Sequence, residues 1–478
     1  MNLQQVLHDK FGYSSFRPGQ EEVIRHILEG RDTAAIFPTG MGKSLCYQLP
    51  AYVMEGAVII VSPLVALMED QVAILRKTKE KRVVAINSFL SRQEKDLALS
   101  TLHRYKFIFL SPEMLMQSHV QQLIEQLKVA FFVVDEAHCI SEWGFDFRPD
   151  YLRMKDFFST EHRAPILALT ATANDQVISD ISSYLNLQHP HIERLPIDRP
   201  AISYRVLHLE NQRAKTDWII ERLSSTRGPG IIYVASRKRA DELSAIIREN
   251  NIRTASYHGG KEQDERSIIQ EQFVQGELDW ICATNAFGMG IHKDDIRQII
   301  HEHLPATPSA YIQEVGRAGR DGKKAAATLL YSERDIEKLK FIIYEDLPDE
   351  QQIRYYHTLV QTGESVKLAA ERAGLSEVAA RLLDYYFEQF DVHHVIQQMR
   401  DIIQVKERQI SEMQKYVKSD GCLRKQLLSY FGEKPVNTAD ECCSLCAEPD
   451  DSWLMQTNVT DKHLSELNWR ERLQQLLG

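Results

Sequence analysis

Residues 33–44 combine residue types that handle phosphate and metal ions. They read TAAIFPTGMGKS, an apolar run that leads into Thr39, Gly40, Met41, Gly42, Lys43 and Ser44. Between a buried strand and a helix, the glycines let backbone N–H groups surround a phosphate, the lysine adds positive charge and the serine hydroxyl can hold Mg²⁺. Phe37 replaces the first glycine of the G-x-x-x-x-G-K-[S/T] spacing. The stretch still predicts a nucleotide phosphate site.

A pair of carboxylates, Asp135 and Glu136, follows the apolar run at 131–134. Open α/β sheets bind ligands at the carboxyl ends of their strands. One carboxylate there can hold the Mg²⁺ that bridges two phosphates, and the other can orient and deprotonate the attacking water. An acidic pair alone more commonly marks a helix N-terminus. The upstream phosphate loop favours the catalytic interpretation.

Two arginines lie three residues apart in YIQEVGRAGRDG, at 317 and 320. That spacing places Arg317 and Arg320 on one helical face. In a two-domain ATPase they could cross the cleft and stabilise charge on the transferred phosphoryl group. Taken alone, such a pair more often faces solvent.

The elements that must position these residues form two series of short apolar strands separated by helices. The predicted strands are 33–37, 57–62, 106–111, 130–136 and 165–172, then 230–236, 254–259, 280–284, 298–305 and 326–332. Such a pattern predicts an α/β fold with two parallel sheets, each covered on both faces. The proline-rich segment 189–200 is predicted to be a linker. We expect lobe 1 at 1–197, lobe 2 at 198–342, a helical zinc-binding domain at 343–447 and a short tail at 448–478.

The seven cysteines are unevenly spread, and four of them, Cys422, Cys442, Cys443 and Cys446, are clustered. This argues against a secreted disulfide framework and fits a tetrahedral structural Zn²⁺. No run of the 478 residues is apolar over membrane length. The net charge of −10 counts mildly against a nucleic-acid partner, although it does not report local patches.

Taken in order, the motifs resemble those of RecQ-type DNA helicases of superfamily two. The match covers nearly the whole chain to residue 446. It includes FGYSSFRPGQ, FPTGMGKS, SPLVALMEDQV, DEAHCISEWGFDFRP, LTATA, ATNAFGMGIHK, YIQEVGRAGRDG and the cysteine cluster. The resemblance implies two RecA-like lobes with ATP and Mg²⁺ between them, followed by a helical zinc-binding domain.

The resemblance also implies roles for individual residues around ATP. Tyr13 would stack on adenine, Gln20 would hydrogen-bond its edge, and Arg17 would support both. Lys43 and Ser44 would bind phosphate and Mg²⁺, Asp135 would hold Mg²⁺, and Glu136 would be the catalytic base. Arg317 and Arg320 would complete the site, with Arg320 preferred as the arginine finger.

For DNA, the resemblance points to the aromatic segment after the acidic pair. Trp143, Phe145, Phe147 and Arg148 would contact or sense single-stranded DNA, since base stacking is sequence-tolerant. For Phe147, a hydrophobic plug over the sheet edge is nearly as good an explanation. Phe145 stands where the family has histidine, and His292 where it has asparagine. The first departure predicts altered coupling.

Three features after residue 343 leave alternatives open. The commonest family spacing would make Asp440 a zinc ligand in place of one cysteine, and we prefer the four cysteines. Residues 365–388 have a helix–turn–helix pattern with Ser376 as N-cap, and equally fit a helical hairpin packed on the zinc region. The 32 residues after the cluster are too few for the winged-helix domain of longer relatives.

The resulting prediction is a monomeric, cytoplasmic ATP-dependent 3′→5′ DNA helicase of recombination and repair, nucleoid-associated if bacterial. Its partners would be single-stranded and tailed or forked duplex DNA, with a single-stranded-DNA-binding protein as a candidate and no membrane. The alternatives are a translocase without efficient unwinding and an RNA helicase.

Overall fold

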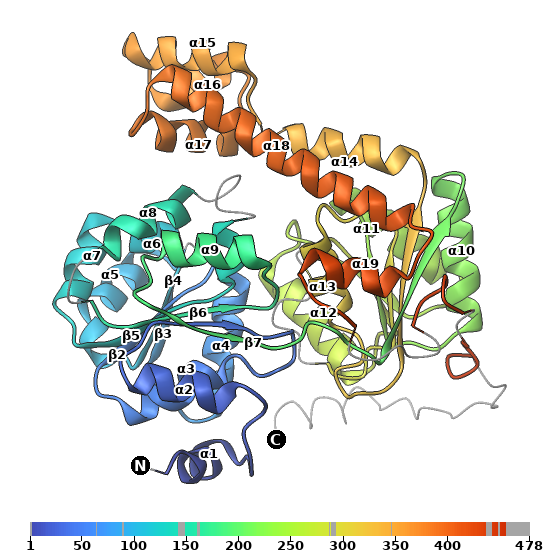
Figure 1. The fold of residues 1–478 in the computed structure, drawn as a ribbon, viewed down its shortest axis with the longest axis horizontal. Helices are drawn as coiled ribbons and strands as arrows, with labels where there is room; N and C mark the ends of the chain where they lie inside the picture. The colour runs from blue at the N-terminus through green and yellow to red at the C-terminus, as the bar shows by residue number, and fades with distance from the viewer. Residues whose placement is uncertain are drawn as a thin grey trace.

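A computed structural model describes residues 2–63, 65–87, 90–141, 149–159, 163–285, 287, 293–345, 347–435, 442–447 and 450–455. Two α/β lobes lie side by side, and a group of helices stands above them (Figure 1). The predicted fold class is confirmed: each lobe has a parallel sheet with helices on its faces, and a helical region follows.

Lobe 1 is built on a seven-stranded parallel sheet of order β3-β4-β2-β5-β6-β1-β7. Its strands are β1 (Thr33–Ile36), β2 (Ala57–Val61), β3 (Val83–Ile86), β4 (Phe107–Leu110), β5 (Val129–Val134), β6 (Ile166–Thr170) and β7 (His191–Arg194). Its helices are α1 (Leu3–Phe11), α2 (Gln20–Leu28), α3 (Leu45–Val53), α4 (Val65–Lys77), α5 (Arg92–Ser100), α6 (Pro112–Leu115), α7 (Ser118–Glu125), α8 (Pro149–Phe157) and α9 (Asp175–Tyr184), with 3-10 turns η1 (Leu102–Arg104) and η2 (Ala137–Ile140). Successive strand residues enter the cores on opposite faces, as Ile59 and Ile60 do.

Lobe 2 has a six-stranded parallel sheet of order β10-β11-β9-β12-β13-β8. Its strands are β8 (Ile202–His208), β9 (Gly230–Tyr233), β10 (Thr254–Tyr257), β11 (Trp280–Ala283), β12 (Gln298–His301) and β13 (Ala325–Tyr331). Its helices are α10 (Gln212–Ser225), α11 (Arg237–Glu249), α12 (Gln263–Gln275) and α13 (Pro308–Val315). Residues 450–455 of the predicted tail pack on this lobe, where Leu454 is buried and Asp451 pairs with Arg205 and Arg222.

Three elements were missed or misread in the sequence. The predicted linker 189–200 contains β7, which pairs in parallel with β1 at the sheet edge. The prolines bracket this strand, and an edge position tolerates them. Strands β3 and β8 were not predicted. β3 is a four-residue run, and the outward-facing residues of the edge strand β8 make it look less apolar than a central strand.

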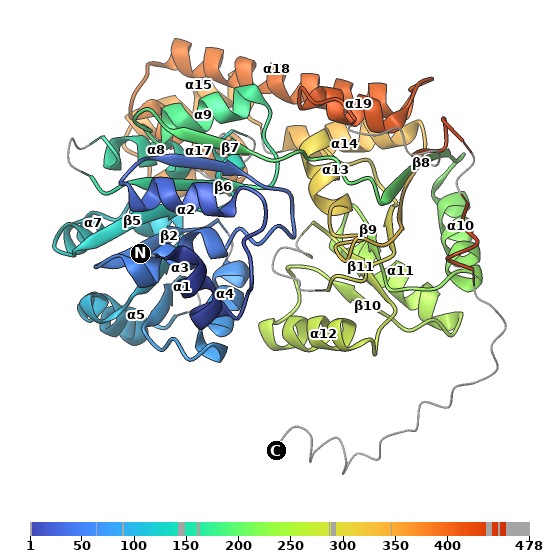
Figure 2. The same ribbon diagram turned by 60° about the horizontal axis from the view of Figure 1, so that its bottom comes forward.

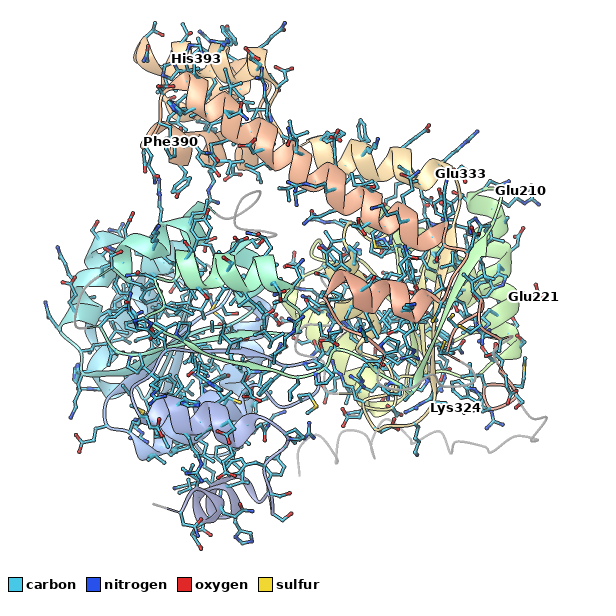
Figure 3. The ribbon with its side chains drawn as sticks, in the orientation of Figure 1. Glu210, Glu221, Lys324, Glu333, Phe390 and His393 are labelled. Carbon is cyan, nitrogen blue, oxygen red and sulfur yellow. The ribbon has the colours of Figure 1, made fainter. Side chains whose placement is uncertain are left out.

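The helical region comprises α14 (Arg334–Glu345), α15 (Glu350–Gln361), α16 (Val366–Ala373), α17 (Glu377–Phe387), α18 (Val392–Val417) and α19 (Leu423–Tyr430). Helix α18 has 26 residues and spans both lobes (Figures 1 and 2). Its first half shares a core with α15–α17, and its second half enters the lobe 2 core through Ile410, Met413 and Tyr416. In Figure 3, the labels Phe390 and His393 mark the turn from α17 into α18.

The helix–turn–helix pattern at 365–388 folds as two helices, and Ser376 is confirmed as an N-cap that accepts from the Ala379 N–H at 3.1 Å. The hairpin packs on lobe 1 and on the first half of α18, which leads toward the cysteine cluster. Leu152 of α8 lies in its core, and Arg153 pairs with Glu388 at 2.6 Å. One face of α17 is buried in this helical core, and DNA binding by the hairpin stays a prediction.

Candidate active site and zinc cluster

The phosphate loop follows β1, the strand between β6 and β7. Gly40 and Gly42 have φ of 90° and 76°, which a residue with a side chain would adopt only with strain. A Cβ at Gly42 would also lie 2.8 Å from Gln20 Nε2. The loop therefore requires glycine at Gly42 both for its conformation and for the close approach of a neighbouring side chain.

The side chains of Gln20 and Arg17 hydrogen-bond to the backbone of this loop. Gln20 Nε2 donates to the carbonyls of Met41 and Gly42 at 2.9 and 3.1 Å, and Gln20 Oε1 accepts from the Arg17 N–H at 2.9 Å. The Arg17 guanidinium donates to the Gly40 carbonyl. Sequence reasoning assigned these residues to adenine only and missed their contact with the loop. Adenine recognition by Gln20 stays a prediction.

The acidic pair ends β5, at the same sheet edge as the phosphate loop. Glu136 has left-handed backbone (φ 48°), and its Oε1 lies 3.9 Å from Lys43 Nζ. Burial raises the pKa of Asp135 to about 6, and the charge of Glu136 adds to this shift. Burial also acts to raise the pKa of Glu136, but Lys43, His138 and Arg317 outweigh it and lower that pKa. Glu136 is therefore an ionised carboxylate at neutral pH.

Lobe 2 closes the site with the turn after α13. Arg317 is buried, and the Cγ and Cδ of Arg320 lie so near the phosphate loop that a Cβ on Gly40 would be 3.3 Å from them. Burial and the nearby Arg317 lower the pKa of Arg320 to about 10, so it stays charged at neutral pH.

One cleft of about 480 Å³ between the lobes brings together nearly all the predicted nucleotide-site residues. Its lining includes Tyr13, Arg17, Gln20, Thr39, Gly40, Gly42, Lys43, Ser44, Asp135, Glu136, Arg317 and Arg320. The Ser44 hydroxyl and the Asp135 carboxylate supply the hard oxygen ligands that Mg²⁺ prefers. The donor set therefore fits ATP with Mg²⁺.

A direct polar contact between the lobes was missed in the sequence, although Gln313 lies within the quoted YIQEVGRAGRDG stretch. Gln313 Nε2 donates to Thr172 Oγ1 at 3.0 Å and lies 3.2 Å from His138 Nε2. The other ring nitrogen of His138 lies 3.0 Å from Thr170 Oγ1 and 3.4 Å from Glu136 Oε2. His138 therefore connects Gln313 of lobe 2 with the strand end that carries Glu136.

The four predicted DNA-coupling residues, Trp143, Phe145, Phe147 and Arg148, lie outside the described residues. The described chain on either side is η2, whose residues are buried, and α8. Asp440, the alternative zinc ligand, and His292 also lie outside the described residues.

The four clustered cysteines converge on one point. Their sulfur atoms all lie within 4.8 Å of one another, and two Sγ–Sγ distances are 3.5 Å. Tetrahedral Zn²⁺ with Zn–S bonds near 2.3 Å needs sulfurs about 3.8 Å apart, so the cluster fits. Burial raises the pKa of Cys443, but the N–H groups of Leu445 and Leu423 outweigh it and bring the value to about 7. Burial instead raises the pKa of Cys442 to about 11 and that of Cys446 further still. A bound cation would therefore have to stabilise these two groups as thiolates.

Zinc removal is expected to unfold this part of the molecule first, because the Cys422 thiol caps α19 and the backbone around Cys443 makes the contact with the lobe 2 sheet. Cys422 Sγ accepts from the Lys425 N–H, and Cys443 forms a parallel bridge with Tyr204 of β8. Cys443→Ser should abolish bound zinc, measured by metal analysis, and lower Tm. Leu445→Ala, at an exposed position between the ligands, should keep the zinc. Retention of full zinc by Cys443→Ser would contradict the assignment.

Two RecA-like lobes that share a nucleotide cleft, with a four-cysteine cluster beyond them, define a superfamily-two helicase with a zinc-binding region. Residues 17–181 match the DEAD/DEAH box helicase family model, 214–322 the helicase conserved C-terminal domain, and 386–447 the RecQ zinc-binding domain. The chain belongs to the RecQ family. It is an ATP-dependent DNA helicase with ATP, Mg²⁺ and Zn²⁺ as cofactors.

Among curated proteins, the chain is similar to the probable ATP-dependent DNA helicase RecS of Bacillus subtilis (strain 168). The two are 42% identical over 93% of this chain and 92% of that protein. The ATP-dependent DNA helicase RecQ of the same strain is 34% identical over 92% of this chain, which spans 66% of that relative's length.

Solved structures support the fold. Mycobacterium smegmatis helicase Lhr bound to ssDNA and AMP-PNP has a TM-score of 0.58 and 18% identity, over 80% of this chain and 55% of that one. Saccharomyces cerevisiae Dbp5 bound to RNA and ADP BeF3 has a TM-score of 0.57 and 20% identity, over 72% of this chain and 90% of that one. Within the described residues, no helix is long and apolar enough to cross a membrane.

Proposed function

We propose that this helicase hydrolyses ATP in the cleft between its lobes, moves 3′→5′ along single-stranded DNA and separates the paired strand, in recombination and repair. The observation that carries the proposal is the composite cleft. Lys43 and Glu136 from lobe 1 and Arg320 from lobe 2 line the same space. Relatives named as DNA helicases over most of this chain support DNA as the substrate.

The protein residues would divide the binding of ATP between the base and the phosphates. Tyr13 is 57% exposed at the cleft and can stack on adenine, while the backbone N–H groups of the phosphate loop and Lys43 receive the phosphates. Ser44 and Asp135 would hold the Mg²⁺. When bound, the ion neutralises charge on the β- and γ-phosphate oxygens.

Hydrolysis would use Glu136 as the base. An oxygen–phosphorus bond forms between water and the γ-phosphorus, the bond to the β–γ bridging oxygen breaks, and the water proton passes to the Glu136 carboxylate. Its Oε2 is buried and accepts no hydrogen bond from the described residues, although a His138 ring nitrogen lies 3.4 Å away, so it retains a lone pair that can receive the proton. Arg317 and Arg320 would stabilise the charge that spreads over the γ-phosphoryl oxygens.

DNA binding would affect ATP hydrolysis through the segment between the acidic pair and α8. We propose that Trp143, Phe145, Phe147 and Arg148 contact single-stranded DNA, since aromatic stacking accepts any base. The contacts among Gln313, His138 and Thr172 cross from lobe 2 to the strand ends beside Glu136. A movement of the lobes relative to each other would therefore change the contacts next to the Glu136 carboxylate.

The proposed partners are single-stranded DNA and tailed or forked duplexes, with a single-stranded-DNA-binding protein as a further partner. The protein would act as a monomer in the cytoplasm, and at the nucleoid if its source is a bacterium. Backbone and stacking contacts would make binding independent of base sequence and sensitive to salt.

Steady-state ATP hydrolysis with matched DNA and RNA strands tests the choice of substrate. Single-stranded DNA should raise kcat by at least about tenfold, and RNA of the same sequence should raise it far less. Lys43→Ala, which removes the charge on the phosphate loop, should show no stimulation by either strand. RNA stimulation that equals or exceeds DNA stimulation would support an RNA helicase instead.

A further inference from the structure

The Arg199 side chain donates hydrogen bonds to backbone carbonyls of both lobes at the nucleotide cleft. It lies in the segment that joins the lobes, between β7 and β8. Its NH1 donates to the carbonyls of Thr39 at 3.2 Å and Gly316 at 3.4 Å. Its NH2 donates to the carbonyls of Ala318 at 3.3 Å and Gly319 at 3.0 Å. One guanidinium therefore joins the phosphate loop of lobe 1 to the turn after α13 in lobe 2.

That turn is the one that carries both arginines of the site. Ala318 and Gly319 lie between Arg317 and Arg320, and the Arg320 stem rests against Gly40 of the phosphate loop. A planar guanidinium with five donors holds several carbonyls in fixed directions, which a lysine cannot do. The four hydrogen bonds of Arg199 therefore tie the position of the Arg317–Arg320 turn to that of the phosphate loop.

Arg199 is itself held from the zinc region. Arg424, which is only 2% exposed, donates to the Arg199 carbonyl at 3.0 Å and to Asp198 Oδ1 at 2.5 Å. It also donates to the Ile202 carbonyl, and its guanidinium lies 5.1 Å from the centre of the Tyr204 ring. Because these contacts fix the backbone at residues 198–202, they fix the origin of the Arg199 side chain.

Arg424 stands in the first turn of α19, next to two of the clustered cysteines. Cys422 is the N-cap of that helix, and Cys443 Sγ accepts from the Leu423 N–H at 3.4 Å. The contacts are therefore continuous from the cysteine cluster through Arg424 to Arg199, and from there to the Arg317–Arg320 turn and the phosphate loop.

We propose that Arg199 is a positioning residue that holds the Arg317–Arg320 turn against the phosphate loop, and that Arg424 anchors it to the zinc cluster. The inference rests on the proposed role of Arg320 in ATP hydrolysis. It assigns a function to a residue in a segment that the sequence indicated only as a linker. It also gives the zinc cluster a role in the ATPase reaction beyond stability.

The expected result for Arg199→Gln is a fall in kcat for DNA-stimulated ATP hydrolysis of about 10- to 100-fold, the scale of a misplaced catalytic group. KM for ATP should change less than threefold, because the adenine and phosphate contacts remain. Arg199→Lys keeps the charge without the fork and should recover only a small part of kcat. Arg253→Gln removes a guanidinium that pairs with Asp279 away from the cleft, and it should match the parent protein.

A double-variant comparison separates positioning from general damage. If Arg199 acts by placing Arg320, then Arg199→Gln should lower kcat no further in an Arg320→Ala background. Arg424→Gln should likewise have little added effect once Arg199 is replaced. Circular dichroism and zinc content, compared with those of the parent, confirm that each variant is folded.

Two outcomes would overturn the inference: a kcat for Arg199→Gln within twofold of the parent, or losses that multiply in the Arg199→Gln/Arg320→Ala double variant. If the losses in kcat of Arg199→Gln and Arg424→Gln multiplied in the double variant, the part of the inference in which Arg424 anchors Arg199 to the zinc cluster would be wrong. Failure of the proposed function has a different signature. In that case Arg320→Ala itself leaves DNA-stimulated hydrolysis unchanged.

Discussion

Arg320→Ala should lower DNA-stimulated ATP hydrolysis by about 10³- to 10⁵-fold, the effect expected of an arginine finger. The side chain approaches the phosphate loop from the opposite lobe, with its stem against Gly40. It remains charged there although burial lowers its pKa to about 10. Its stabilising effect would appear only as charge develops on the γ-phosphoryl group. ATP affinity should therefore fall much less than kcat.

The measurement is kcat by phosphate release, beside the affinity for a fluorescent ATP analogue. Arg320→Lys tests geometry against charge and should recover little, because a lysine lacks the planar fork. Arg253→Gln, at a position that does not line the cleft, is the matched control. A loss of less than tenfold in kcat for a folded Arg320→Ala variant would show that Arg320 is not the arginine finger. Arg317 would then be the candidate for that role.

Glu136→Gln should reduce kcat by about 10²- to 10⁴-fold, the usual contribution of a general base. The amide keeps the size of the side chain but cannot accept the water proton. The pKa of Glu136 lies below its ordinary value because Lys43, His138 and Arg317 outweigh the effect of burial. A lowered pKa means that the base form persists as pH falls toward the ordinary glutamate range, so activity near neutral pH should not titrate through this group.

The variant should still bind ATP and single-stranded DNA, because the phosphate loop and the rest of the cleft are unchanged. Filter binding and fluorescence anisotropy measure the two affinities beside kcat. Glu242→Gln, on α11 and away from the cleft, should leave all three quantities unchanged. If Glu136→Gln hydrolysed ATP at half the parent rate or faster, another group would have to be the base.

Much of the fold could be predicted because its central strands are near-continuous apolar runs. That signal fades at sheet edges. Strand β8 alternates buried and partly exposed residues, and β7 lies among prolines that favoured a linker. The helix–turn–helix pattern gave the local structure correctly but not its location, since nothing local shows that α17 faces α8 across more than 200 residues of chain.

In the site, the phosphate loop and the acidic pair could be predicted because each occupies one short stretch with a characteristic spacing. Arg199 and Gln313 could not be assigned in this way. Their roles arise only when the lobes meet, and their partners lie on segments distant in sequence. The contacts of Gln20 with the loop carbonyls could not be foreseen for the same reason.

The most direct test of the central claim is ATP-dependent strand separation of a 3′-tailed DNA duplex, beside a 5′-tailed DNA duplex and a 3′-tailed RNA duplex. We predict that only the 3′-tailed DNA is separated, and that Glu136→Gln separates none. DNA-stimulated ATP hydrolysis without strand separation would indicate a translocase, and preferential separation of the RNA or the 5′-tailed duplex would contradict the proposed substrate or polarity.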